Sequence, residues 1–259
     1  MAGSFSSPSV LGLFATKNPT SSSGTVSRLR AHTREALAFA RQASLIHLDF
    51  GAVLPTETRA GDHIVVLLHG LFATAGVLRP MRKRIESETG AHTASFSYLP
   101  GPGVNHLGVE LASLVKRLPA ETHLHLVGHS LGGVVARYFV QELGGDPRVR
   151  QTVSLGSPFG GTDHARLMPA TAGRDISPGS TILQRVVGAA EQHAHVPHLS
   201  ISGADDQVVT GFSHLPGSEH VELADCGHNG LLYDSRAADL VVSRIRSAID
   251  ASLARNPAA

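Results

Sequence analysis

The stretch HLVGHSLGG, residues 125–133, decides the fold that we predict for this chain. Its apolar residues are typical of a buried strand, which runs directly into Gly-x-Ser-x-Gly and then into a helical pattern. Gly128 and Gly132 let strand and helix approach closely, because neither carries a Cβ atom. The alternative is that Ser130 is only a helix N-cap on a tight turn. The order of strand, turn and helix favours a strained turn that lifts the Ser130 hydroxyl above a sheet.

Short apolar runs alternate with helical patterns on both sides of this stretch. Such alternation predicts a parallel sheet covered on both faces, because right-handed crossovers place helices there. The expected fold class is therefore α/β, with a doubly wound, mostly parallel sheet of about six strands. The expected strands are Ile64–Leu68, Thr93–Tyr98, Leu124–Val127, Thr152–Leu155, Leu199–Ser202 and His220–Leu223. The expected helices are Ala75–Glu88, His106–Arg117, Leu131–Leu143, Thr181–Ala190 and Ser235–Ala251.

Patterns outside these elements set the expected domain organisation. Residues 1–24 are rich in Ser, Gly and Pro, which predicts a flexible N-terminal leader. Residues 25–44 have a helical apolar period, and we expect a helix packed on the edge of the domain rather than a membrane-surface helix. The domain itself is expected to span residues 25–259. Residues 157–180 lack a clear period, which predicts a short cap or binding loop.

Composition narrows the classes of function. The formal net charge is only +1, which provides no field that would attract nucleic acid. Cys226 is the single cysteine, so no disulfide can form within the chain. We find neither a secretory signal nor the ~20 consecutive apolar residues that span a bilayer, and a cytoplasmic location is the default expectation.

A second strand end offers hydrogen-bond donors for a negatively charged reaction intermediate. His69-Gly70-Leu71 follows the apolar run 64–68. If Ser130 attacks an acyl carbonyl, backbone N–H groups must face the oxyanion that forms. We expect these donors to be the amides of Leu71 and Leu131, the latter at a helix N-terminus. His69 is expected to shape its loop.

The acid and the base that would activate Ser130 are expected on later loops. In enzymes with this serine turn, the chain order is serine, acid, histidine. Asp205 and Asp206 follow the apolar run 199–202, and His228 follows the next expected strand. His228 would accept the Ser130 proton while one aspartate orients the imidazole. Neighbouring side chains diverge in direction, so only one aspartate can point at His228.

The chain contains 16 histidines, so most of them must be structural or face solvent. The group His193, His195 and His198 raises the question of a zinc site. Its spacing matches no closed zinc site well, and no cysteine lies nearby. We therefore predict no metal ligands here.

Four motifs in order resemble the lipase and esterase branch of the α/β-hydrolase superfamily, in particular small bacterial triacylglycerol lipases. They are HGL at 69–71, GHSLGG at 128–133, LGSPFGGT at 155–162 and GHNGLL at 227–232. The resemblance implies hydrolysis of carboxylic esters without a cofactor. It also implies that Asp206 is the acid, since these lipases carry it three residues before a valine, a spacing that Asp205 shares. The calcium-binding insertions of larger lipases have no match.

The expected substrate pocket is apolar. Its expected lining comes from residues in or beside the site loops, namely Phe72, Phe159, Leu167, Met168 and Leu231. The alternative is that half of them are ordinary core residues. The expected partner is a small-molecule or lipid ester, with transient contact to a lipid interface.

Other functions on the same residues stay open. Acyl transfer to an acceptor other than water and thioester cleavage both use the same triad. A binding module without catalysis is a further alternative on this fold. The presence of Ser130, an aspartate and His228 in the required order argues against it.

Overall fold

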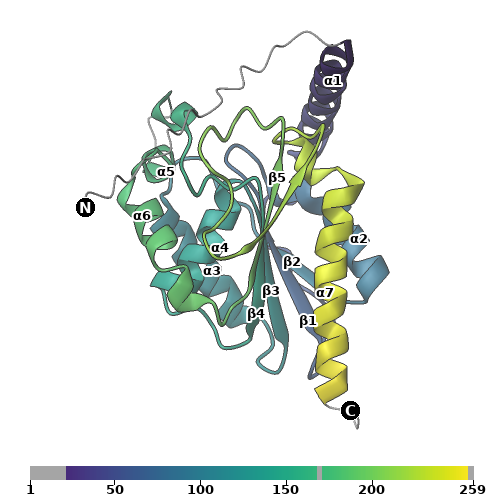
Figure 1. The fold of residues 1–259 in the computed structure, drawn as a ribbon. Coiled ribbons are helices and arrows are strands. Elements are labelled where there is room, and N and C mark those ends of the chain that lie inside the picture. Colours follow the sequence, from purple (N-terminus) through teal and green to yellow (C-terminus); the bar gives the residue numbers. More distant parts are fainter. Residues whose placement is uncertain (1–21, 168–170, 256–259) are drawn as a thin grey trace, which may run out of the picture.

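The computed structural model describes residues 22–167 and 171–255, and its centre is a parallel sheet (Figure 1). Within these residues the sheet has six strands in the order β2-β1-β3-β4-β5-β6, and every neighbouring pair is parallel. The strands are β1 His63–Leu68, β2 His92–Ser95, β3 His123–His129, β4 Val149–Leu155, β5 His198–Gly203 and β6 Glu219–Leu223. The expected fold class is confirmed.

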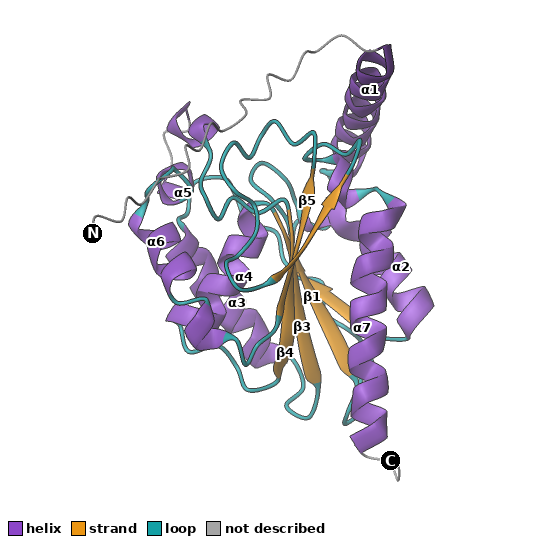
Figure 2. Ribbon diagram, in the orientation of Figure 1, coloured by secondary structure: helices purple, strands orange, loops and turns teal. Residues whose placement is uncertain are grey.

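Helices cover both faces of the sheet (Figure 2). Helices α3, α4 and α6 pack on one face, and α2 and α7 pack together on the other. The helices are α1 Ser22–Leu45, α2 Arg79–Thr89, α3 Val104–Arg117, α4 Leu131–Glu142, α5 Thr171–Asp175, α6 Thr181–Gly188 and α7 Ser235–Arg255. Short 3-10 turns are η1 Ala75–Leu78, η2 Asp163–Leu167, η3 Glu191–His193 and η4 Gly230–Leu232.

The interior position of β3 explains its sequence. It lies between β1 and β4, and six of its seven residues are buried. All six residues of β1 are buried as well, which accounts for its continuous apolar run. Strand β6 is at the sheet edge and is largely exposed, so its sequence is more polar. The sheet therefore presents the end of β3 at its centre.

Several element boundaries differ from the expected ones. The run 93–98 leaves the sheet at Ser95, and Tyr98 instead donates its backbone N–H to His69 Nε2. The run 75–88 begins as the 3-10 turn η1, and α2 starts at Arg79 with Pro80 in its first turn, where the missing N–H costs no helical bond. Residues 157–180 contain η2 and α5 rather than a loop alone.

Helix α1 extends the expected helix 25–44 to Ser22–Leu45, so residues 22–24 of the expected leader are helical. Residues 1–21 lie outside the described residues. Ala31 and Ala38 are buried against the domain, whereas Leu37 and Phe39 are exposed.

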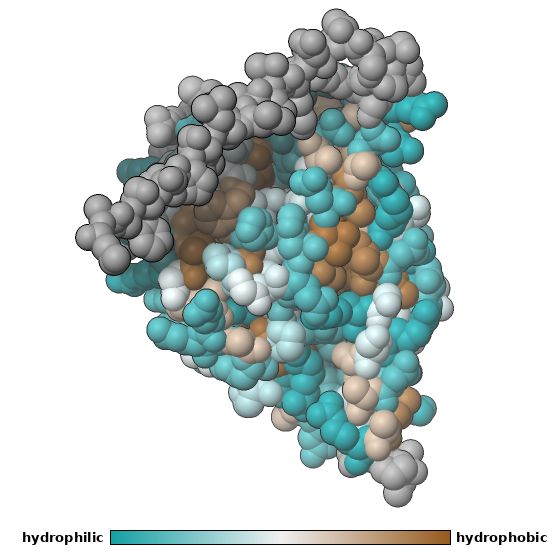
Figure 3. Space-filling model, in the orientation of Figure 1, coloured by the Kyte–Doolittle hydropathy of each residue, from teal (hydrophilic) through white to brown (hydrophobic). Residues whose placement is uncertain are grey.

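Figure 3 shows a mainly hydrophilic face with an apolar patch near the N-terminal part of α7. None of the helices in 22–167 and 171–255 combines the length and apolar character needed to cross a bilayer.

Candidate active site

Ser130 sits on a strained turn between β3 and α4. Its backbone has φ 52° and ψ −121°, a conformation that side chains rarely adopt. The flanking glycines are required: a Cβ at Gly128 would lie 2.2 Å from the Gly133 nitrogen. A Cβ at Gly132 would lie 2.5 Å from the Leu68 carbonyl oxygen at the end of β1. The turn is the strand-to-helix elbow that the sequence predicts.

The loop after β1 holds the peptide that carries the Leu71 amide. His69 Nδ1 lies 2.7 Å from the Gly70 carbonyl oxygen and must donate to it, while His69 Nε2 accepts from the Tyr98 amide at 3.1 Å. Burial lowers the pKa of His69 to about 4, so the ring is neutral. A trans peptide directs its N–H opposite to its C=O, so this bond aims the Leu71 N–H away from His69.

The same loop touches the Ser130 turn. A Cβ added at Gly70 would lie 3.1 Å from the Ser130 Cβ, which leaves no room for a side chain there. The Leu131 amide is the first of helix α4 and follows Ser130 directly. N–H groups in the first turn of a helix have no partner within the helix. The two expected oxyanion donors thus lie on segments that meet at Ser130.

Asp206 and His228 form a buried pair on the loops after β5 and β6. Asp206 Oδ2 lies 2.8 Å from His228 Nδ1, and Asp206 Oδ1 accepts from the amides of Val208 and Val209 at 2.9 Å each. Burial by itself raises the pKa of Asp206, but the hydrogen bonds from His228, Val209 and Val208 outweigh it and keep the pKa below its ordinary value. A charged carboxylate at Nδ1 leaves Nε2 of a neutral His228 without a proton.

Asp205 takes no part in this pair. The carboxylate that binds backbone N–H groups of this turn belongs to Asp206. Asp205 instead donates its backbone amide to the Cys226 carbonyl at 3.0 Å. Of the two neighbouring carboxylates, that of Asp206 is the one that contacts His228.

His129 connects the Ser130 turn with the His228 loop. Its Nε2 donates to the His228 carbonyl oxygen at 3.1 Å, and the two rings lie 4.7 Å apart. Burial lowers the pKa of His129 to about 3, which keeps the ring neutral. Among the described side chains, Ser130 Oγ forms no hydrogen bond with His228.

Gly156, directly after β4, lies against the Asp206 and His228 pair. Its φ is 58°, and an added Cβ would lie 3.1 Å from Asp206 Oδ2 and 3.2 Å from His228 Nδ1. The same Cβ would lie 2.9 Å from Leu231 Cδ1. The motif at 155–162 by itself indicates no role for Gly156. Its position one residue past a strand end was the available signal.

The expected substrate-binding residues lie in different surroundings. Phe159 is only 1% exposed and meets the His198 ring edge-on in the core, whereas Phe72 is 56% exposed. Leu231 is fully buried behind the Asp206 and His228 pair. Leu167 ends η2, and Met168 lies outside the described residues. Phe159 and Leu231 are therefore core residues in this structure.

A pocket of about 300 Å³ reaches His228. Helix α1 forms one wall and the loop after β5 forms the other, and the lining residues are Ala31, His32, Glu35, Asp205, Gln207, Val208 and His228. This lining contains none of the apolar residues that we expected. Sequence reasoning placed α1 at the edge of the domain and missed its contact with the site.

The histidine group 193–198 does not converge. His198 is buried, and its two ring nitrogens lie 2.6 Å from Thr152 Oγ1 and 3.0 Å from Ser154 Oγ. Within the described ranges, no three His, Cys, Asp or Glu side chains are grouped to hold a metal ion.

A doubly wound parallel sheet with a serine elbow at its centre defines an α/β-hydrolase. The structure is similar to the mature form of the lipase BlEst2 from Bacillus licheniformis, with a TM-score of 0.60 and 14% identity over 75% of this chain and 96% of that one. Residues 64–198, just over half of the chain, match the palmitoyl protein thioesterase family, and the chain belongs to that family. It is a hydrolase-type enzyme.

Two further solved structures share the fold. Lipase B from Aspergillus fumigatus has a TM-score of 0.60 and 18% identity, covering 75% of this chain and 56% of that one. A protein described as a putative aryl esterase from Burkholderia cenocepacia has a TM-score of 0.54 and 19% identity, covering 74% and 93%. At these identities the similarity concerns the fold alone.

Proposed function

We propose that this chain hydrolyses carboxylic esters of acyl chains through a covalent intermediate on Ser130. The observation that carries the proposal is the buried hydrogen bond of 2.8 Å between Asp206 and His228. His129, next to Ser130, binds the backbone of His228 and so holds the His228 loop beside the Ser130 elbow. Serine, acid and histidine on three separate loops form the arrangement that acyl transfer uses. Structural neighbours described as lipases and esterases support the same class of substrate.

In the first half of the proposed reaction, Ser130 Oγ attacks the carbonyl carbon of the ester and its proton passes to His228 Nε2. Asp206 stabilises the imidazolium that forms. The carbonyl oxygen becomes an oxyanion, which the amides of Leu71 and Leu131 would receive. When the tetrahedral intermediate collapses, the bond to the leaving alkoxide breaks, and His228 returns the proton to it.

In the second half, water replaces the alcohol. His228 takes a proton from water while the water oxygen attacks the acyl carbon. The second tetrahedral intermediate then collapses, the bond between the acyl carbon and Ser130 Oγ breaks, and the carboxylic acid is released. Ser130 Oγ then regains its proton from His228. The cycle consumes only ester and water and includes no redox step.

Ser130→Ala tests the proposal. We expect hydrolysis of p-nitrophenyl esters to fall by about 10⁴-fold or more, with an unchanged melting temperature, because the hydroxyl supplies chemistry and little packing. Wild-type protein should also react with a fluorophosphonate probe, and the variant should not. Turnover in the variant above a tenth of the wild-type value would mean that Ser130 is not the nucleophile. Absence of both reactions in wild type would favour a binding module.

A second candidate is hydrolysis of acyl thioesters, and the match to the palmitoyl protein thioesterase family favours it. The same side chains suffice, because a thiolate departs more readily than an alkoxide and needs less help from His228. Parallel measurements of kcat/KM on a palmitoyl thioester and on the matching p-nitrophenyl ester separate the two candidates. An added alcohol acceptor that diverts the product to a new ester would instead indicate acyl transfer.

A further inference from the structure

Helix α1 places a carboxylate against the loop of His228. Glu35 Oε1 accepts hydrogen bonds from the Asn229 backbone amide at 2.7 Å and from Asn229 Nδ2 at 3.0 Å. Glu35 Oε2 accepts from the Gly230 amide at 2.9 Å. Both oxygens are thus used, and both backbone donors come directly after His228.

The same carboxylate also touches the residue before His228. A Cβ added at Gly227 would lie 2.4 Å from Glu35 Oε2, so Glu35 occupies the space that a side chain at residue 227 would need. On the other side of the loop, His129 Nε2 donates to the His228 carbonyl oxygen. The peptide segment of His228 is therefore held between the Ser130 turn and α1, with hydrogen bonds on both sides.

The segment 228–230 lies between the core residues Cys226 and Leu231, which are both buried. It follows β6, an edge strand, and precedes the 3-10 turn η4. N–H groups at the start of such a turn have no partner within it, and Glu35 supplies partners for two of them. Charge-assisted bonds of this kind are about twice as strong as neutral ones.

We propose that Glu35 is a positioning residue for His228, acting through the backbone of Asn229 and Gly230. This inference rests on the proposed role of His228 as the base. The Asp206 contact sets the direction of the imidazole, whereas Glu35 sets where its backbone lies. A displacement of the ring by 1 Å can cost about 100-fold in rate, so the anchor matters although it touches no reacting atom.

Glu35→Gln is the sharpest test, because glutamine keeps the size and one acceptor oxygen but turns an amide NH₂ toward a backbone N–H. We expect kcat on a p-nitrophenyl ester to fall about 10- to 100-fold, with KM changed less than about threefold. The fluorophosphonate probe should label the variant more slowly by a similar factor, yet to completion. A merely structural defect would leave part of the protein unlabelled and would not slow the rest.

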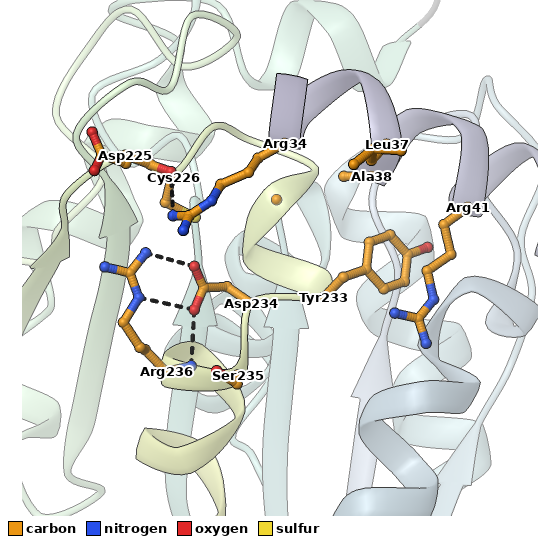
Figure 4. A pocket seen from close by; sticks show the side chains of 11 residues that line it. Arg34, Leu37, Ala38, Arg41, Asp225, Cys226, Tyr233, Asp234, Ser235 and Arg236 are labelled. Atoms are coloured by element: carbon orange, nitrogen blue, oxygen red, sulfur yellow. Dashed lines mark hydrogen bonds and ion pairs between the residues drawn. The ribbon is translucent and has the colours of Figure 1, made fainter. Parts of the chain in front are cut away.

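Arg41→Ala is the matched control on the same helix. Arg41 lies over the Tyr233 ring, with 4.9 Å between its guanidinium carbon and the ring centroid (Figure 4). Its loss weakens the docking of α1 without removing the Glu35 bonds, so kcat should stay within about twofold. A similar fall in both variants would attribute the effect to α1 docking and overturn a specific role of Glu35.

The outcomes also separate this inference from the proposed function. Wild-type protein that neither hydrolyses esters nor reacts with the probe would overturn the proposed function itself. An active wild type together with a Glu35→Gln variant of unchanged kcat and labelling rate would overturn the positioning role alone.

Discussion

Asp206 uses both carboxylate oxygens, one for His228 and one for the turn that carries it. Asp206→Asn keeps an acceptor for the Val208 and Val209 amides but no longer favours the productive tautomer of His228. We expect kcat to fall by up to about 10⁴-fold with a small change in melting temperature. Asp205→Asn should leave both quantities close to wild type. Measurement of kcat and melting temperature for the two variants side by side checks the assignment, and a crippled Asp205→Asn beside an active Asp206→Asn would reverse it.

The contact between α4 and β1 depends on the absence of a side chain at Gly132. In Gly132→Ala the new Cβ would lie 2.5 Å from the Leu68 carbonyl and 2.8 Å from that of His69, so the start of α4 must move away from β1. Because the two segments carry the Leu131 and Leu71 amides, we expect ester hydrolysis to fall at least 100-fold, the cost of losing one oxyanion donor. The melting temperature should fall as well.

Gly188→Ala, in helix α6, is the control for a glycine-to-alanine change in a helix that causes no clash. Gly188 ends α6, and a Cβ there meets nothing within 4 Å, so alanine should be neutral or slightly stabilising. If Gly132→Ala behaved like Gly188→Ala in both activity and melting temperature, close packing of α4 on β1 would not be what positions the two amides.

At the scale of the whole molecule, buried neutral histidines make stability depend on pH. Burial lowers the pKa values of His63 and His69 to about 4 and those of His125 and His129 to about 3. The unfolded chain takes up protons near pH 6.5, whereas the folded chain does not until the pH is far lower. The contribution of these histidines to the free energy of unfolding is therefore fully present above pH 6.5. It is lost as the pH falls toward 4, by about 1.4 kcal/mol per pH unit for each proton that the unfolded chain takes up.

Urea unfolding between pH 7.5 and 4.5 measures this loss. His125 accepts from Gln151 Nε2 at 3.0 Å and lies 2.8 Å from His63 Nδ1, so the pair is held in its neutral form. His125→Gln should flatten the pH dependence by about one proton while keeping polar contacts. A stability that is constant over this range, or a variant as steep as wild type, would contradict the account.

The sequence alone was sufficient to predict the sheet, its covering helices and the Ser130 elbow, because these depend on patterns within a few residues. The period of the runs around residues 64, 124 and 199 reflects burial on both faces of a sheet. Gly128 and Gly132 flank Ser130 because strand and helix must meet there. The chain order also located the loops of the aspartate and of His228. These features follow from covalent geometry and local packing.

Only the tertiary structure decided which side chains meet across long separations in the chain. Hydrophobicity indicates that Phe159 is buried, but not that it packs on His198 in the core instead of lining a pocket. A helical period predicts α1, but not that its Glu35 binds Asn229, 194 residues away. The direction of Asp206 relative to Asp205 likewise depends on where the loop leaves β5. Local patterns determine elements, whereas contacts between elements depend on how each element packs on the others.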